Sequence, residues 1–143
     1  MSDPSCLFCK IAAKEISSKI VYENEHVLAF LDATPRAMGH TLVISKVHAP
    51  NILDLPDDGP NNEIGPLFSA VKHVDDMLSR SLNPDGMTIG INQGRASGQE
   101  VDHLHVHLLP RWHNDGGHSI QSVVDKPPQE SLDEVLKKIV GGA

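Results

Sequence analysis

Residues 102–111 read DHLHVHLLPR, and this stretch decides how the rest of the chain is arranged. Histidines alternate with apolar residues in it, and successive side chains of a β-strand point to opposite faces of a sheet. The pattern therefore predicts a strand that presents His103, His105 and His107 on one face and buries its apolar side chains on the other. Pro110 has no N–H for a ladder and is expected to end the strand.

The three imidazoles indicate chemistry rather than packing. Imidazole is an acid, a base, a nucleophile and a ligand near neutral pH, and each ring carries two polar nitrogens that need partners. A solvated, histidine-rich edge strand is the alternative interpretation. The intervening apolar residues favour a packed strand, so we expect a functional face.

Length and charge limit the class of protein. A chain of 143 residues is expected to form a single domain, residues 1–143, with a real core. The net charge of −7 makes a nucleic-acid backbone an unfavourable main partner. No apolar run reaches 18 residues, and no basic stretch followed by an apolar one opens the chain. We therefore expect no membrane association, no signal peptide and a cytoplasmic location.

The two cysteines form the motif Cys6-x-x-Cys9. A disulfide is unfavourable in a reducing compartment, and a redox dithiol normally follows a strand in a βαβ unit, which is not expected here. Metal ligation is the better interpretation, but two thiols are half of a tetrahedral zinc site, so histidines would have to complete it. Two ordinary buried thiols remain the alternative.

The sequence predicts five strands and three helices joined by loops. Strands are expected at residues 20–23, 27–32, 41–45, 87–92 and 101–109, and helices at residues 6–14, 63–82 and 131–140. The long helix has an apolar stripe at helical spacing, and the last one begins with a Ser131–Glu134 capping box. Because strands and helices alternate little, we expect an α+β fold, an antiparallel five-stranded sheet with helices packed on one face.

A glycine-containing polar loop, residues 93–99, leads into the histidine strand. Gly94 and Gly98 permit positive φ and let backbone N–H groups approach an anion. A phosphate site and a plain hairpin connection both fit this loop.

Together these residues resemble the histidine triad (HIT) family. The pattern His103-φ-His105-φ-His107-φ-φ, where φ is apolar, is similar to its signature, and the likeness extends to residues 30–32, 40–44, Lys46, His48, Asn92, Gly98 and Gln99. It covers residues 6–112, which would be the HIT-like core, and leaves a C-terminal tail. Residues 110–112 and 115–117 look most like small prokaryotic members.

The resemblance implies a nucleotide-binding hydrolase or transferase, usually a homodimer, that acts on a purine nucleotide. A histidine would attack the α-phosphate of a nucleoside phosphoramidate or dinucleoside polyphosphate, and water would release a nucleoside monophosphate from the covalent nucleotidyl-histidine. By position, His105 is the nucleophile, and His107 contacts the phosphate or assists the leaving group. His40 and Gln99 complete the catalytic set. An imidazole with a pKa of about 6.5 is largely neutral at pH 7, as a nucleophile must be.

The same resemblance implies the substrate contacts. Asp32 would accept hydrogen bonds from the ribose hydroxyls, with a plain surface carboxylate as the alternative. Asn92 would contact the phosphate region. The base would lie among Phe8, Ile11 and Phe30, for which simple core packing is the alternative.

Some prokaryotic members also resemble this chain in a Cys-x-x-Cys motif that binds zinc. The implied ligands are Cys6, Cys9, His48 and His103, one structural zinc per chain, with no organic cofactor. His103 would then be a ligand, whereas only His105 and His107 would face the substrate.

One residue departs from the family pattern, and two other classes of function compete. Glu100 stands where several members have a hydroxyl residue, and an ionised carboxylate only accepts hydrogen bonds. The choice between phosphoramidates and dinucleoside polyphosphates therefore stays open. The first competing class is a nucleotide-binding interaction module with little catalysis. The second is a catalytic metal site built from all three strand histidines.

Overall fold

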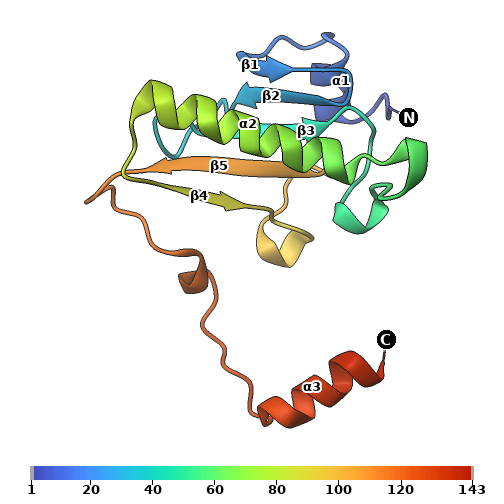
Figure 1. Ribbon diagram of the computed structural model, residues 1–143, viewed down its shortest axis with the longest axis vertical. Coiled ribbons are helices and arrows are strands. Elements are labelled where there is room, and N and C mark those ends of the chain that lie inside the picture. The colour runs from blue at the N-terminus through green and yellow to red at the C-terminus, as the bar shows by residue number, and fades with distance from the viewer. Residues whose placement is uncertain (1, 143) are drawn as a thin grey trace.

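The structure is a computed structural model that describes residues 2–142 and contains a five-stranded antiparallel sheet. In chain order its strands are β1 (Ile20–Glu23), β2 (Val27–Leu31), β3 (Thr41–Ser45), β4 (Gly86–Gly90) and β5 (His105–Arg111). Across the sheet they follow the order β1-β2-β3-β5-β4 (Figure 1). The expected α+β fold is confirmed. The histidine strand β5 lies between β3 and β4, which excludes an edge strand.

β5 begins and ends later than the alternation predicts. Residues 101–104 lie outside the strand, and the strand continues through Pro110 to Arg111. The Arg111 carbonyl accepts from Asp85 N on the β4 side, so the Pro110 nitrogen points the other way. Pairing with β3 stops at Leu108, and the missing N–H of Pro110 therefore breaks no ladder bond. The expectation that Pro110 ends the strand was wrong for this reason.

The long helix α2 (Ile64–Leu82) covers one face of the sheet, as expected (Figure 1). Its stripe of Leu67, Val71, Val74 and Leu78 packs on the inward side chains of β2, β3 and β5. Among these is Val106, from the apolar face of the histidine strand. The helix ends where Asn83 adopts a left-handed φ of 50°, a conformation that asparagine tolerates.

The short helix α1 (Leu7–Ala12) packs on the opposite face of the sheet, which corrects the expectation that the helices share one face. It buries Phe8, Cys9 and Ile11 against side chains of β2 and β3 that alternate with those under α2: Leu28, Phe30, Leu42 and Ile44. Periodicity shows that a helix has an apolar side. It does not show which face of a sheet receives it.

The C-terminal tail leaves the sheet after β5 and ends in helix α3 (Leu132–Gly141). The Ser131–Glu134 capping box is present. Figure 1 shows α3 standing off from the sheet at the end of an extended segment, and none of its residues is buried. In residues 2–142 no helix is both long and apolar enough to cross a bilayer.

Gly39 is required where the chain turns into β3. Its φ is +83°, and a Cβ there would lie 2.4 Å from Leu82 Cδ1 and 3.3 Å from Pro110 Cγ. Gly39→Ala adds left-handed strain of about 1–2 kcal/mol and overpacking of about 1–3 kcal/mol. We expect chemical denaturation to show a loss of about 2–5 kcal/mol in the free energy of unfolding.

Gly59 is the matched control, because it also has positive φ, +60°, but nothing lies within 4 Å of the position that a Cβ would take there. Gly59→Ala is expected to cost about 1–2 kcal/mol through strain alone. Equal losses in the two variants would contradict the packing argument at Gly39.

Candidate functional site

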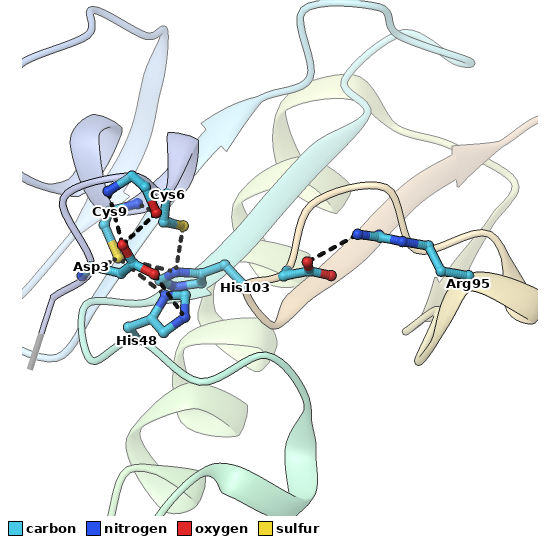
Figure 2. Close-up of polar contacts among 8 residues, drawn as sticks. Asp3, Cys6, Cys9, His48, Arg95 and His103 are labelled. Carbon is cyan, nitrogen blue, oxygen red and sulfur yellow. Dashed lines mark hydrogen bonds and ion pairs between the residues drawn. The ribbon is translucent and has the colours of Figure 1, made fainter.

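Four sulfur and nitrogen donors meet beside the N-terminal helix. Cys6 Sγ and Cys9 Sγ each lie 3.5 Å from His103 Nδ1, and Cys9 Sγ lies 3.3 Å from His48 Nδ1. All four donor atoms lie within 4.8 Å of one another. Figure 2 shows the four side chains pointing toward a common centre, with Asp3 beside them. The structure thus brings together the four residues predicted as metal ligands.

The spacing of these donors fits a tetrahedral zinc ion. Zn–S bonds of about 2.3 Å and Zn–N bonds of about 2.0–2.1 Å at tetrahedral angles place sulfur and nitrogen about 3.5 Å apart. The three observed sulfur–nitrogen distances are 3.3–3.5 Å. Without an ion, burial raises the pKa of the Cys9 thiol, and a bound cation would reverse that effect.

The surroundings orient the two histidines of this cluster for ligation. His103 Nε2 lies 2.7 Å from the Ser45 carbonyl, which only accepts, so Nε2 carries the proton and Nδ1 offers its lone pair to the thiols. His48 Nε2 lies 3.9 Å from Asp3 Oδ2. A carbonyl or carboxylate behind each histidine is the usual arrangement around a protein-bound metal.

His105 lies buried at the start of β5, two residues after the metal-type ligand His103. Its Nδ1 lies 2.7 Å from the His103 carbonyl oxygen, so Nδ1 carries the proton and donates it. The lone pair is therefore on Nε2, as a nucleophilic imidazole requires. The expected hydrogen bond to a backbone carbonyl is present. The Phe8 ring packs edge-on against this imidazole, with ring centres 5.0 Å apart.

A second hydrogen-bonded pair, His40 and His107, lies beside His105. The backbone N–H of Arg36 donates to His40 Nδ1 at 3.1 Å, so the His40 proton is on Nε2. His40 Nε2 lies 2.9 Å from His107 Nδ1 and donates to it, which leaves the His107 proton on Nε2. This chain of hydrogen bonds, from the Arg36 N–H through His40 to His107, thus ends in an N–H donor beside the His105 ring.

Both rings of this pair are held neutral. Burial, together with smaller effects of the neighbouring His105 and His40 imidazoles, lowers the pKa of His107 to about 4, against an opposing effect of Asp32. Burial also lowers the pKa of His40. At neutral pH His107 is therefore a neutral donor rather than an imidazolium.

Asp32 lies next to this pair, at the end of β2. Its Oδ1 accepts from the backbone N–H and the hydroxyl of Thr34, at 2.9 and 3.2 Å. Its Oδ2 lies 3.6 Å from His40 Nε2. The carboxylate is therefore a fixed member of the site, whereas its contact with a ribose stays a prediction.

The apolar residues predicted to hold a base form a packed cluster. Phe8, Ile11 and Phe30 are buried between α1 and β2, and the rings of Phe8 and Phe30 meet edge-on with centres 5.6 Å apart. The structure therefore shows core packing for these side chains. Their contact with a base stays a prediction.

Gln99 differs from its predicted place among the catalytic residues. Its amide accepts from Gly94 N at 2.8 Å and donates to the carbonyls of Pro50 at 2.7 Å and Val101 at 3.0 Å. Both N–H groups are thus used to close the loop. Gly94 and Gly98 have the expected positive φ, 84° and 103°, and Asn92 is exposed at the start of this loop.

A cleft of about 820 Å³ lies on the histidine face, above β4 and β5. His40, His107 and Asn92 line it, together with Ser97 and the tail residue Ile120. The apolar cluster of α1 covers β2 and β3 on the same face. The histidine pair therefore stands between an apolar half and an open half of this face.

Arg36 also lines this cleft and was missed from the sequence. It lies in a proline-containing loop with no periodic pattern. The sequence did offer one indication that Arg36 belongs to the site: it is a positive charge between Asp32 and His40 in a chain of net charge −7. Glu100, in contrast, is exposed and lies outside the lining of the cleft.

A single metal site built from the three strand histidines is excluded by the geometry of residues 2–142. His103 and His107 belong to two separate clusters of possible metal ligands. His103 lies with the two thiols and His48, whereas His107 lies with Asp32 and His40. His105 belongs to neither cluster.

The chain is similar to known proteins along almost its whole length. It is 46% identical over 138 residues to an uncharacterized HIT-like protein of Methanocaldococcus jannaschii, covering 95% of this chain and 99% of that one. It is 33% identical over 137 residues to the adenosine 5'-monophosphoramidase of Saccharomyces cerevisiae, covering 96% and 79%. An adenylylsulfatase of Arabidopsis thaliana is 31% identical over 110 residues, 77% of this chain and 54% of that one.

Solved structures and a family model agree with these relatives. A HIT family protein from Bacillus anthracis superimposes with a TM-score of 0.82 at 38% identity, covering 99% of this chain and 96% of that one. A zinc-bound histidine triad family protein from Mycobacterium smegmatis gives a TM-score of 0.70 at 27% identity, covering 97% and 98%. The HIT domain model matches residues 13–123. The chain therefore belongs to the histidine triad family.

Proposed function

We propose that this protein is a hydrolase that transfers the nucleotidyl group of a purine nucleotide to His105 and then to water. One observation carries this proposal: the 2.7 Å hydrogen bond from His105 Nδ1 to the His103 carbonyl, which leaves Nε2 unprotonated beside the His107 donor. Two relatives support adenylates as substrates, since they are named for cleaving an adenosine phosphoramidate and an adenylyl sulfate.

In the first step, the lone pair of His105 Nε2 attacks the α-phosphorus, and the bond to the leaving group breaks. The His105 ring becomes positive as its N–P bond forms, and the His103 carbonyl at Nδ1 stabilises that charge. The Nε2–H of His107 donates to the phosphate oxygens, on which negative charge accumulates. Water then attacks the same phosphorus, the N–P bond breaks with its electron pair returning to His105 Nε2, and the nucleoside monophosphate leaves while one proton of the water passes to the solvent.

The two halves of the histidine face supply substrate binding. We place the base against Phe8, Ile11 and Phe30, and the ribose hydroxyls at Asp32, because both lie on the α1 side of the histidine pair. The phosphate then lies between His105 and His107, with Asn92 and the loop of Gly94 at its far side. Holding the reactants in this geometry is most of what phosphoryl-type transfer requires.

We also propose that Cys6, Cys9, His48 and His103 hold one structural zinc ion. Their donor spacing fits zinc, and the zinc-bound relative supports this choice of metal. A bound zinc would contribute a cross-link rather than catalysis, because four protein ligands leave no open position. Free thiols such as Cys6 and Cys9 stay reduced in a reducing compartment, and we therefore propose a cytoplasmic location.

A homodimer is the third part of the proposal, formed by α2 and the outer edge of β4. β4 pairs only with β5 among the described strands, so its other edge is free. Phe68 on α2 is 42% exposed and Ile89 on β4 is 38% exposed. Met87 packs under α2, and Ile89 shares its face of the strand. We place the interface at these exposed apolar side chains and the free strand edge.

Replacement of the nucleophile tests the central proposal. His105→Asn is expected to abolish turnover of adenosine phosphoramidate and diadenosine polyphosphates while AMP binding persists. His107→Ala is expected to slow turnover by roughly 10²–10³, the usual effect of losing one stabilising donor. Mass spectrometry of quenched wild-type protein should find one nucleotidyl group on the peptide that contains His105.

His113→Asn is the control, because His113 is exposed and does not line the cleft. An adduct on His107, or full turnover by His105→Asn, would show that the roles are wrongly assigned. AMP binding without any turnover by the wild-type protein would favour an interaction module.

Metal analysis tests the zinc proposal. Protein purified without chelator should contain about one zinc per chain. Cys9→Ser should lose the metal and about 2.7 kcal/mol or more of stability, the linkage value at one hundred times the Kd. His26→Gln is the control, since His26 pairs with Glu63 away from the cluster. Metal-free protein of equal stability would refute the site.

Sedimentation tests the dimer. The wild-type chain should sediment as a dimer at micromolar concentration, and Phe68→Lys should dissociate it by placing a charge in the apolar interface. Ile16→Lys is the control, because Ile16 is similarly exposed at 38% but lies in the α1–β1 connection. A monomeric wild-type chain would contradict the proposal.

A further inference from the structure

We propose that Arg36 selects substrates whose leaving group is an anionic oxoacid, such as a phosphate, a polyphosphate or a sulfate joined to the α-phosphate by an anhydride bond. This inference rests on the proposed transfer at His105 and specifies its substrate class. It predicts that the chain prefers anhydrides over phosphoramidates with amine leaving groups.

The open cleft is the space available to a leaving group. The apolar half of the histidine face consists of Phe8, Phe30 and their neighbours. We have placed the base of the substrate against this half. A group that departs from the α-phosphorus must move away from His105 Nε2. The cleft of about 820 Å³ beyond His107 is therefore where it goes.

Arg36 supplies the positive charge in that cleft. Three of the four arginines of the chain, Arg80, Arg95 and Arg111, are paired with carboxylates. Within residues 2–142 no such pair engages Arg36, which is exposed and borders the cleft. The guanidinium carries five donors in a planar fork that suits phosphate and sulfate oxygens. An amine has no matching acceptor oxygens.

The histidine pair is arranged to donate a hydrogen bond but not to release a proton. His40 Nδ1 already accepts from the Arg36 backbone N–H, so the pair holds two protons, on His40 Nε2 and His107 Nε2. Full transfer from His107 would leave an imidazolate in the pair. The amides and hydroxyls that line the cleft, among them Asn92 and Ser97, donate hydrogen bonds but are too weakly acidic to protonate a leaving group.

The leaving group must therefore tolerate departure without a proton. As His105 Nε2 forms its bond to phosphorus, the bridging P–O bond breaks and its electron pair stays on the departing oxygen. A phosphate or sulfate leaves as an oxyanion, which Arg36 can pair with directly. A departing amine would need a proton on its nitrogen, and among the described residues that line the cleft none is an acid strong enough to supply it.

Arg36→Gln isolates the side chain, because the backbone N–H that holds His40 is retained. The kcat/KM values for diadenosine tetraphosphate and adenylyl sulfate are compared with the value for adenosine phosphoramidate. Loss of one charge-assisted contact should lower each anhydride-to-phosphoramidate ratio by about tenfold. Arg36→Lys should keep part of the preference, because it keeps the charge but loses the fork.

Arg80→Gln is the control, since Arg80 pairs with Asp76 on α2, across the sheet from the cleft. An unchanged ratio in Arg36→Gln, with wild-type turnover intact, would overturn this inference and leave the proposed function standing. A lowered ratio for one anhydride alone would assign Arg36 to phosphate or to sulfate leaving groups.

Binding separates failure of the two proposals. If the wild-type protein has no turnover, the affinity ratio of ATP to AMP is measured by calorimetry in the wild-type and Arg36→Gln proteins. A decrease of about tenfold in this affinity ratio in Arg36→Gln would support binding of the distal phosphates by Arg36 even though the hydrolase proposal fails. An unchanged ratio, or no binding of either nucleotide, overturns it.

Discussion

The hydrogen bond between the His103 carbonyl and His105 Nδ1 joins the two halves of the site. The His103 ring is held on one side by the Ser45 carbonyl and faces both thiols on the other. The peptide that carries the His103 carbonyl is also held on its other side, because the Leu104 N–H donates to the Ala49 carbonyl at 2.7 Å. The His103 carbonyl therefore stays directed at His105, and that direction decides which nitrogen of His105 carries the lone pair. One backbone carbonyl thus connects the proposed zinc ligand His103 with the proposed nucleophile His105.

The alternation of the histidine strand was sufficient to predict much of this arrangement. In a central strand each side chain must face one side of the sheet, so Val106 packs under α2 while His105 and His107 face the other side. The capping box of α3 and the left-handed glycines of the 93–99 loop were also predictable, because they depend on neighbouring residues alone. The four metal-type ligands were found by resemblance rather than by spacing.

What the sequence could not predict depends on contacts between distant segments. The apolar stripe of α1 gave no sign of the sheet face that would receive it. The Gln99 amide fits a substrate contact until the carbonyl of Pro50, 49 residues earlier, is found beside it. Pro110 can continue the strand because its nitrogen points to the side of β3, and no β3 residue pairs with β5 beyond Leu108. Helix α3 was predictable from its capping box and apolar spacing alone, but none of its residues is buried, so its apolar side packs against no other element.

Charge in this protein must be considered locally. The whole chain carries −7, which disfavours polyanions at long range, yet the cleft borders Arg36 and two histidines kept neutral by burial. Neutral imidazoles cost less to bury than charged ones. The described residues that line the cleft include the Arg36 guanidinium and no carboxylate. A small anion can then be recognised through a few directed N–H groups, whereas an extended polyanion meets the acidic exterior. Because the same burial keeps His107 neutral, no imidazolium is present there at neutral pH to supply a proton. Recognition of the anion and limited proton supply thus have one physical origin.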